Sequence, residues 1–330
     1  MDISINEKKK IRRIGVLTSG GDAPGMNAAI RAVVRNCIQH DIIPVGIHRG
    51  YNGLINSDVR TLDARAVNRI TSLGGTMLYT ARCEEFKTLE GQKRGADVCQ
   101  YLGIDGLICI GGDGTFRGVE AISKLGVNAV GIPATIDNDI ACTHYSIGFD
   151  TAANTAIDAI DKLADTMQSH ERASVVEVMG RAAGHLALYV GLAVGATAIL
   201  LPEKPCDFNK DLIEKIRESR YNGKHHFLII VAEGVGGAQE IADKIKAETG
   251  VEARVTTLGH VQRGGSPSAR DRVMASRMGH FAVERLIEGE TDMIVCYRDS
   301  QICSVPIKEA LSMTKSLSDY MYRVAQDISI

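Results

Sequence analysis

The sequence predicts an α/β fold built on mainly parallel sheets, and three observations lead to this prediction. Short runs of β-branched and apolar residues alternate with segments of helical periodicity along the whole chain. These runs are continuously apolar, as in parallel strands that are covered on both faces. Glycine-rich turns follow two of the runs, where a strand would pass into a helix. Repeated strand–helix–strand units of this kind form parallel sheets flanked by helices.

The predicted elements fill the chain without a low-complexity linker or a fixed repeat. Nine strands in 330 residues favour two sheets, with a division near residue 150. Ligands of parallel sheets bind beyond the carboxyl ends of the strands, so the turns there are the first candidates for a site. Strands are predicted at residues 14–18, 42–47, 106–110, 129–132, 174–178, 198–201, 227–231, 254–258 and 292–296, and helices at residues 30–38, 116–124, 151–167, 182–194, 209–220, 238–248 and 269–288.

The composition excludes several classes of protein. Apolar residues make up 45% of the chain and charged residues 24%, which is typical of a folded protein with a core. The 38 basic and 40 acidic residues give a net charge of −2, and Trp is absent, so no nucleic-acid partner is expected. The eight cysteines include no Cys-x-x-Cys pair, and a disulfide framework is not expected in a chain of this length.

Neither a secretory signal nor a membrane span is predicted. Residues 1–13 end in a basic run with no adjoining apolar stretch. The longest uncharged run, residues 186–202, is shorter than the roughly 20 residues that a membrane helix needs. It also contains Gly191 and Gly195, and we interpret it as a buried helix followed by a buried strand. We therefore expect a cytoplasmic protein.

Two glycine-rich turns are candidate anion sites. Residues 19–25 (SGGDAPG) and residues 110–115 (IGGDGT) each lie between a predicted strand and a helix. The backbone N–H groups of such a turn and the helix dipole both favour a bound anion. Glycine turns also arise for steric reasons alone, but two of them in one sheet favour phosphate binding. Asp113 in the second turn suits either a magnesium ligand or a side chain that stabilises the turn.

Charged side chains follow other predicted strands. Asp137 and Asp139 come after the strand at residues 129–132, and such a pair suits phosphoryl transfer, with one carboxylate as base and one near a metal. Solvated, inert carboxylates are the alternative interpretation. Arginines near strand ends, whose planar guanidinium groups suit phosphate, indicate as a set a doubly phosphorylated reaction centre. These arginines are Arg82, Arg172, Arg181, Arg254 and Arg263, accompanied by His170, His260 and Glu233.

Five segments in this order resemble the ATP-dependent 6-phosphofructokinases of the bacterial type. They are SGGDAPGMNAAIR (19–31), IGGDGT (110–115), PATIDND (133–139), VVEVMGR (175–181) and LGHVQRGGSPSARDR (258–272). The resemblance implies two Rossmann-like three-layer α/β domains with mainly parallel sheets. The larger, ATP-binding domain would comprise residues 1–148 and 262–312, and the smaller, fructose 6-phosphate-binding domain residues 149–261 and 313–330.

The resemblance also implies a reaction, the transfer of the γ-phosphoryl group of MgATP to the C1 hydroxyl of fructose 6-phosphate in glycolysis. Asp137 would take the hydroxyl proton, supported by Thr135 and Asp139, and Arg181 would stabilise the charge of the transferred group. An ordinary aspartate, with a pKa of about 3.9, is ionised at neutral pH and can accept that proton. The ATP site would comprise Gly21, Arg82, Cys83, Gly112, Asp113, Gly114 and Thr115, with Asp113 on Mg²⁺ and with Tyr51 and Gly118 nearby.

The sugar-phosphate site implied by the resemblance is completed by a neighbouring subunit of a homotetramer. From that subunit, Arg172 and Arg254 would reach the fructose 6-phosphate. The full set is Thr135, Ile136, Asp137, Arg172, Met179, Gly180, Arg181, Glu233, Arg254, His260, Val261, Gln262 and Arg263.

Two positions bear on the phosphoryl donor. Pyrophosphate-dependent relatives carry Asp at the position of Gly114 and Lys at that of Ala134. An Asp side chain would crowd and repel the α-phosphate of ATP, so both residues favour ATP. Cys83 stands where an aromatic residue is common in the family, so stacking on the adenine is less certain.

Regulation is expected to depart from the family pattern. Arg31, Arg35 and Lys224 match residues of a second site that binds ADP or phosphoenolpyruvate in bacterial members. Two other arginines of that site are replaced by Ala64 and Ala164, and its acidic residue by Thr197. Because guanidinium groups form strong bonds to phosphate, we expect weak or altered control by these effectors.

Three other functions compete with this interpretation. The first is a pyrophosphate-dependent phosphofructokinase, and the second is a catalytically silent sensor of sugar phosphates or nucleotides on the same fold. Retention of Asp113, Asp137, Asp139 and Arg181 disfavours the silent sensor. The third, an oxidoreductase, is disfavoured because the chain lacks GxGxxG with an acidic residue downstream.

Overall fold

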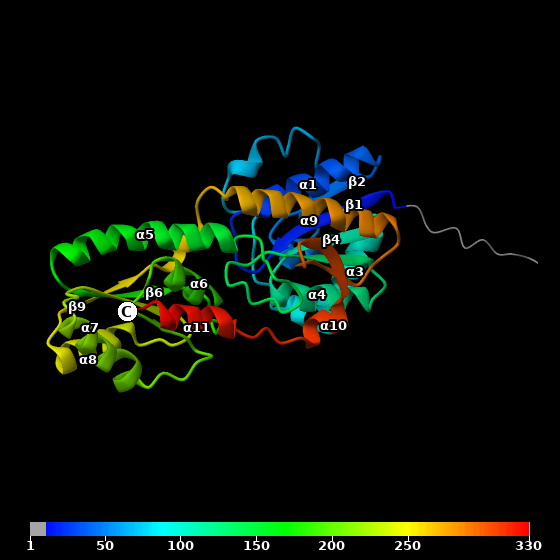
Figure 1. The fold of residues 1–330 in the computed structure, drawn as a ribbon. Helices are drawn as coiled ribbons and strands as arrows, with labels where there is room; N and C mark the ends of the chain where they lie inside the picture. Colours follow the sequence, from blue (N-terminus) through cyan, green and yellow to red (C-terminus); the bar gives the residue numbers. More distant parts are fainter. Residues whose placement is uncertain (1–10, 330) are drawn as a thin grey trace, which may run out of the picture. The chain divides into compact units, whose positions relative to one another are not determined.

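The computed structural model describes residues 11–329, so most of the basic segment at the start of the chain lies outside the described residues (Figure 1). The described residues form two compact units, each built on a mainly parallel sheet, which confirms the predicted fold class. The larger unit comprises residues 11–135, 140–148 and 266–314. The smaller unit comprises residues 136–139, 149–265 and 315–329.

The larger unit is a seven-stranded sheet with helices on both faces. Its strands are β1 (Arg13–Ser19), β2 (Ile43–Ile47), β3 (Val59–Thr61), β4 (Gly106–Gly111), β5 (Ala129–Pro133), β10 (Met293–Arg298) and β11 (Gln301–Pro306). Its helices are α1 (Met26–Gln39), α2 (Gly50–Ile55), α3 (Leu89–Tyr101), α4 (Asp113–Ser123), α9 (Ala269–Ile287) and α10 (Ile307–Ser312), with short 3₁₀ turns η1 (Ile70–Ser72) and η2 (Glu85–Lys87).

The strand order of this sheet is β11-β10-β5-β4-β1-β2-β3. The five inner strands are parallel, and the two edge strands, β3 and β11, pair antiparallel to their neighbours. Helices α1 and α9 cover one face and α3, α4 and α10 the other (Figure 1). From β1 the chain passes first to β2 on one side and later to β4 on the other, so the strand order reverses between β1 and β4.

The smaller unit is a four-stranded, fully parallel sheet with the order β7-β8-β6-β9. Its strands are β6 (Ala173–Val178), β7 (Ala198–Leu200), β8 (Phe227–Ala232) and β9 (Ala253–Thr257). Its helices are α5 (Phe149–Ser169), α6 (His185–Ala193), α7 (Lys215–Tyr221), α8 (Ala238–Thr249) and α11 (Asp319–Asp327), with η3 (Phe208–Glu214), a π-helix, and η4 (Gly259–Arg263), a 3₁₀ turn.

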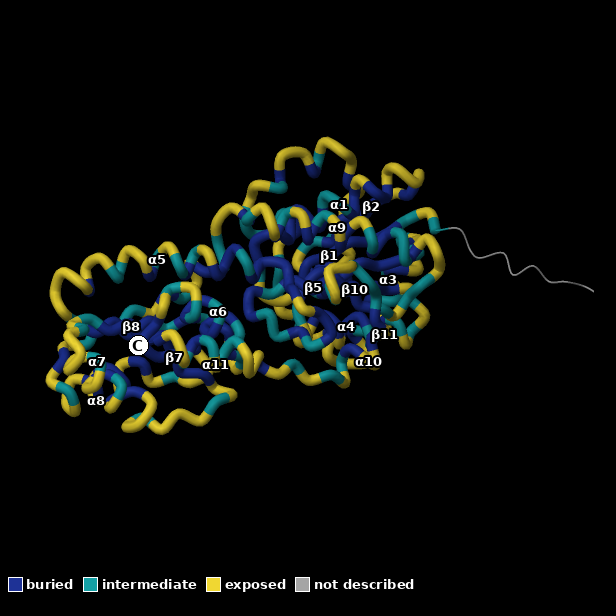
Figure 2. The backbone as a smooth tube through the Cα atoms, viewed as in Figure 1, coloured by how far each residue is buried: buried dark blue, intermediate teal, exposed yellow. Residues whose placement is uncertain are grey.

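The inner strands of the larger sheet and strands β6, β7 and β8 of the smaller one are largely buried, whereas the helices expose their outer faces (Figure 2). Every residue of β4, β5 and β8 is buried, which explains the continuously apolar runs in the sequence. The uncharged run at residues 186–202 forms most of α6 followed by β7, as predicted. Among the described residues, no helix combines the length and the apolar character that crossing a membrane would require.

All nine predicted strands are present, but the edge strands β3 and β11 were not predicted. Both are partly exposed, and β3 has only three residues, so neither shows the apolar run on which the prediction depended. Helix α3 was also missed, because Gly91 and Gly95 interrupt its helical pattern. The short helices α2, α10 and α11 were not predicted either.

A buried carboxylate fixes the segment that leads out of the larger unit. Asp271, in the first turn of α9, is fully buried. Its Oδ1 accepts hydrogen bonds from the Tyr145 hydroxyl at 2.5 Å and from the backbone N–H of Gly148 at 2.7 Å. Charged groups are rarely buried without such partners. Asp271 therefore holds residues 145–148 against the start of α9.

We predict opposite effects on stability for two glycine substitutions in α4. A Cβ atom at Gly118 would lie 2.5 Å from the buried Tyr51 ring, so Gly118→Ala should lower the free energy of unfolding by about 1–3 kcal/mol. At Gly114 a Cβ atom meets nothing within 4 Å, and Gly114→Ala should be neutral or add up to about 1 kcal/mol. Urea unfolding of the two variants measures the difference, and equal stabilities would contradict the close packing of Gly118 on Tyr51.

Candidate active site

Two glycine-rich loops meet at the carboxyl edge of the larger sheet. Residues 19–25 follow β1 and residues 111–115 follow β4, and these strands are direct neighbours. The strand order reverses between them, which is where open α/β sheets bind ligands. The Thr115 hydroxyl donates to the Ser19 carbonyl oxygen at 3.0 Å and connects the two loops. The structure thus places both predicted anion loops side by side.

Glycine is required where the loops touch. A Cβ atom at Gly111 would lie 2.4 Å from the Ser19 carbonyl oxygen and 2.3 Å from the Thr115 hydroxyl oxygen. Gly25, immediately before α1, has φ 107°, a conformation that L side chains rarely adopt. Neither α1 nor α4 has a side chain that caps its first turn. Their N-terminal N–H groups therefore face the loop region without a side-chain cap and favour an anion.

The residues predicted beside the nucleotide divide into a packed group and an exposed one. Tyr51 is buried, stacks on Phe86 at 4.1 Å between ring centroids, and donates its hydroxyl to the Thr115 carbonyl oxygen at 2.7 Å. Cys83 is partly buried and packs against the same core. Arg82 is exposed. Tyr51 therefore holds the second glycine loop through Thr115, whereas the Arg82 side chain is exposed to solvent.

Asp113 is the first residue of α4, and its side chain is about half exposed at 53%. Its Oδ2 lies 3.0 Å from Nε of Arg117, one helical turn further on. Sequence reasoning missed Arg117, because the helix was predicted to begin at residue 116, whereas it begins at Asp113 and places the two side chains four residues apart on it. Among the described residues, no group of three or more His, Cys, Asp or Glu side chains could hold a metal ion. A lone carboxylate at this place suits Mg²⁺ that takes its other ligands from phosphate and water.

In the smaller unit the central feature is a buried carboxylate. Asp137 is only 2% exposed, and its Oδ2 lies 3.8 Å from Nε of Arg181. Burial raises the pKa of Asp137, and the nearby carboxylate of Asp139 raises it further. The guanidinium groups of Arg263 and Arg181 act in the opposite direction, and Glu233 adds a small increase to this pKa. The expectation of an ordinary aspartate pKa is therefore wrong, because the sequence did not reveal the burial.

Arg181 and Glu233 follow neighbouring strands, β6 and β8. The Glu233 Oε2 atom accepts hydrogen bonds from the backbone N–H of Gly180 at 3.1 Å and of Arg181 at 2.8 Å. Arg181 has φ 54°, which is uncommon for a residue other than glycine. Hydrogen bonds thus join the loop after β6 to the loop after β8. These two loops carry the predicted residues Met179, Gly180, Arg181 and Glu233.

The segment after β9 packs against the loop that follows β6. Gln262 is fully buried, accepts the Met179 N–H through Oε1 at 3.3 Å, and donates through Nε2 to the Gly259 carbonyl oxygen at 3.0 Å. The side chain of Gln262 therefore connects two loops and is not itself at the surface. His260 and Val261 are exposed, and Arg263 is partly buried and close enough to lower the pKa of Asp137.

Arg172 and Arg254 lie at the opposite edge of the smaller sheet. Arg172 directly precedes β6, and Arg254 is the second residue of β9, paired in register with Ser174. The Lys246 ammonium group, hydrogen-bonded to Glu252 at 2.9 Å, is the main cause of the lowered pKa of that carboxylate. The guanidinium group of Arg254, 3.6 Å from Glu252, and that of Arg172 lower it further. Within this chain the predicted arginine set is thus divided, since Arg181 and Arg263 follow strands whereas Arg172 and Arg254 lie at strand starts.

The predicted effector residues also fall into two places. Arg31 and Arg35 lie one turn apart on α1, and burial together with Arg35 lowers the pKa of Arg31. An open groove of about 470 Å³ is lined by Arg35, Ile38, Gln39 and Ala64. Lys224 belongs to the smaller unit and is partly buried, which lowers its pKa.

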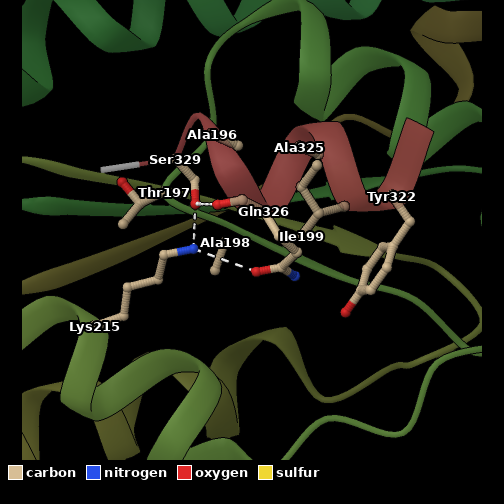
Figure 3. A pocket seen from close by; sticks show the side chains of 9 residues that line it. All are labelled: Ala196, Thr197, Ala198, Ile199, Lys215, Tyr322, Ala325, Gln326 and Ser329. Atoms are coloured by element: carbon tan, nitrogen blue, oxygen red, sulfur yellow. Dashed lines mark hydrogen bonds between the residues drawn. The ribbon is translucent and has the colours of Figure 1, made fainter. Parts of the chain in front are cut away.

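A small cavity lies beside Thr197 in the smaller unit (Figure 3). Thr197 is buried, and its hydroxyl oxygen accepts the Leu228 N–H at 3.3 Å. Lys215 points into the cavity and donates to Gln326 Oε1 at 3.4 Å and to the Ser329 hydroxyl oxygen. The cavity measures only about 10 Å³, which is room for a single water molecule.

Comparisons with known proteins identify relatives along nearly the whole chain. Residues 13–286 match the family described as phosphofructokinase. An ATP-dependent 6-phosphofructokinase of Clostridium botulinum (strain Loch Maree / Type A3) is 53% identical over 97% of this chain and 100% of its own length. A protein of the same name from Clostridium novyi (strain NT) matches equally well in identity and coverage.

Solved structures of phosphofructokinases share the fold. The Saccharomyces cerevisiae phosphofructokinase is 34% identical with a TM-score of 0.86, and the match covers 97% of this chain but 48% of the yeast chain. The pyrophosphate-dependent phosphofructokinase of Marinobacter aquaeolei has a TM-score of 0.84, with coverage of 97% and 92% of the two chains. At 21% identity that likeness concerns the fold alone. From the family match and the 53% identity to full-length relatives, it follows that this chain belongs to the phosphofructokinase family.

Proposed function

We propose that this protein is an ATP-dependent 6-phosphofructokinase that works in glycolysis. It transfers the γ-phosphoryl group of ATP to the C1 hydroxyl of fructose 6-phosphate and releases fructose 1,6-bisphosphate and ADP. The observation that carries the proposal is the buried Asp137 carboxylate, 3.8 Å from Arg181, in a chain 53% identical to proteins of that name. A cytoplasmic location accords with this pathway.

In this proposal the larger unit binds ATP at the two glycine loops. Gly21, Gly112 and Gly114 present backbone N–H groups to the phosphates, and Arg82 contributes a guanidinium group. Thr115 completes the loop, while its own backbone N–H donates to the Gly112 carbonyl oxygen at 2.9 Å. Support comes from the uncapped N-termini of α1 and α4 and from the open space at Gly114. Cys83 packs on the core, so it offers little stacking surface to an adenine ring.

Mg²⁺ is proposed to bind with ATP through Asp113, where it would neutralise charge on the phosphates. The half-exposed carboxylate can reach such an ion once it exchanges its ion pair with Arg117 for the metal. Surface ion pairs of this kind contribute at most about 1 kcal/mol, so the exchange costs little.

Asp137 is proposed to accept the proton of the C1 hydroxyl as the phosphoryl group moves. A base whose pKa is raised toward the working pH accepts protons more effectively in the transition state. Arg181 would stabilise the negative charge of the transferred group, with Thr135 and Asp139 as neighbours of the base. Phosphoryl transfer needs chiefly positioning and charge compensation, and these residues supply both.

Fructose 6-phosphate is proposed to bind at the carboxyl edge of the smaller sheet. Met179, Gly180, Glu233, His260 and Arg263 surround that edge, with Ile136, Val261 and Gln262 shaping it. Gln262 acts there by connecting loops, since its side chain is fully buried.

The sugar-phosphate site is proposed to be completed by arginines of another subunit. Arg172 and Arg254 lie at the amino edge of the same sheet, so they do not join this chain's own cluster. Both could serve a neighbouring site in a homotetramer. In that arrangement each active site contains residues of two subunits.

The donor assay is the direct test of the proposed function. Purified protein is incubated with fructose 6-phosphate and either MgATP or magnesium pyrophosphate, and ADP and fructose 1,6-bisphosphate are measured. We expect bisphosphate with ATP and little with pyrophosphate, because Gly114 leaves room for the α-phosphate. Faster turnover with pyrophosphate would identify the other donor class, and no product with either would favour a silent sensor.

Replacing the proposed base should separate activity from stability. Asp137→Asn is expected to lower kcat by about 10²–10⁴-fold, with little change in affinity for fructose 6-phosphate. Folding raises the pKa of Asp137, so ionisation of this carboxyl group lowers the stability of the folded protein. The loss is complete at pH values above the folded-state pKa and absent at pH values below the unfolded-state pKa. The variant should therefore be more stable than the wild type at neutral pH, with the gain vanishing near pH 3.

Turnover and denaturant unfolding at several pH values measure both effects. A variant with near-normal kcat would remove Asp137 from the mechanism. A stability gain that persists unchanged at the lowest pH would show that the gain does not come from removing the buried charge.

Control by ADP and phosphoenolpyruvate is expected to be weak. With alanine at positions 64 and 164, either effector should change the half-saturating fructose 6-phosphate concentration by less than about twofold. Ala64→Arg places a guanidinium group on the groove beside Arg35 and should increase the response. Saturation curves with and without effector test both statements, and a strong response of the wild type would overturn the first.

A further inference from the structure

Glu233 makes contacts that sugar binding alone does not explain. Its Oε2 atom accepts the backbone N–H groups of both Gly180 and Arg181, at 3.1 and 2.8 Å. Its own backbone N–H donates to the Val178 carbonyl oxygen at 2.8 Å, which extends the β6–β8 pairing to the base of the same turn. One carboxylate oxygen thus holds two successive amides of the neighbouring loop.

The turn held in this way is strained. Gly180 has φ 152°, and a Cβ atom there would lie 2.4 Å from the Ala183 carbonyl oxygen. Arg181 has φ 54°, in the left-handed region that disfavours residues with a Cβ atom. A backbone in such a conformation persists only where surrounding contacts determine it. The two hydrogen bonds to Glu233 are such contacts, at the strained residues themselves.

The backbone conformation of this turn sets the position and the direction of the Cα–Cβ bond of Arg181. The Arg181 side chain is 59% exposed, yet its Nε lies 3.8 Å from the buried Asp137 carboxylate. An ion pair with one exposed partner is too weak to hold a long side chain by itself. The direction of the side chain is therefore set by the backbone, and through the backbone by Glu233.

We propose that Glu233 is a positioning residue for Arg181 in phosphoryl transfer. The inference rests on the proposed function and extends the role of Glu233 beyond the sugar contact. The two roles are compatible, because Oε2 holds the loop while Glu233 as a whole is exposed and can offer its other oxygen to a hydroxyl group. Loss of the loop contact should therefore act on kcat, whereas loss of a sugar contact acts on KM.

Two substitutions at the same position test this role. Glu233→Gln retains an acceptor oxygen at the same reach, so kcat should stay within about threefold of the wild type. Glu233→Ala removes the acceptor and releases the strained turn, and kcat should fall about tenfold or more at saturating substrates. Glu240→Ala removes an exposed carboxylate from the first turn of α8 and should leave kcat unchanged.

Hydrogen exchange at the Arg181 backbone amide provides a readout independent of activity. Exchange should be at least about tenfold faster in Glu233→Ala than in Glu233→Gln or Glu240→Ala, because the hydrogen bond to Oε2 is lost. Thermal unfolding of all variants reports whether the alanine variant folds normally.

The outcomes separate the two proposals. A rise in KM with unchanged kcat in Glu233→Ala would overturn positioning and leave only sugar binding. An equal loss of kcat in the glutamine and alanine variants would point to the charge of Glu233 and would also overturn it. If the wild type transfers no phosphoryl group, the proposed function fails, and unchanged exchange at Arg181 would then reject the contact independently.

Discussion

The smaller unit is organised around the cost of burying one negative charge. Asp137 has lost nearly all contact with solvent and has a second carboxylate, Asp139, as its neighbour. Both effects disfavour its ionised form, which explains the direction of its pKa shift. Nearby cations oppose both effects, and the guanidinium groups of Arg263 and Arg181 lower the pKa of Asp137. The surrounding loops are best understood as the means of holding those cations.

Parallel sheets make this arrangement accessible to segments far apart in sequence. Strands β6, β8 and β9 are neighbours with the same direction, so Arg181, Glu233 and Arg263 emerge at one edge. The larger sheet repeats the principle with β1 and β4 and their glycine loops. In both sheets backbone groups carry much of the geometry: amides bond to Glu233 in one, and close backbone contacts at Gly111 bind the loops in the other. Glycine and left-handed residues occur there because a Cβ atom or a regular backbone would prevent these approaches.

Much of the fold was accessible from the sequence because buried parallel strands are apolar throughout. The edge strands β3 and β11 escaped because one of their sides faces solvent and the apolar run is lost. The order of residues along the chain was also sufficient to find the loops of the candidate site. It did not reveal which side chains are buried, so neither the raised pKa of Asp137 nor the burial of Gln262 was predicted. The arginines were grouped by distance from strands, although Arg172 precedes β6 and Arg181 follows it, and the two ends of a strand face opposite edges.

The difference between buried and solvent-exposed charges can explain why the proposed catalytic residues are retained while some residues of the proposed effector site are replaced. Asp137 and its cations are interdependent, since removing either guanidinium group would leave the buried charge less compensated. Arg35 and Ala64 instead line an open groove, where no described acidic side chain pairs with Arg35. An arginine at such a surface can become alanine without leaving a buried partner unsatisfied. Substitution is therefore tolerated where charges meet solvent, and it is restricted where the fold encloses them.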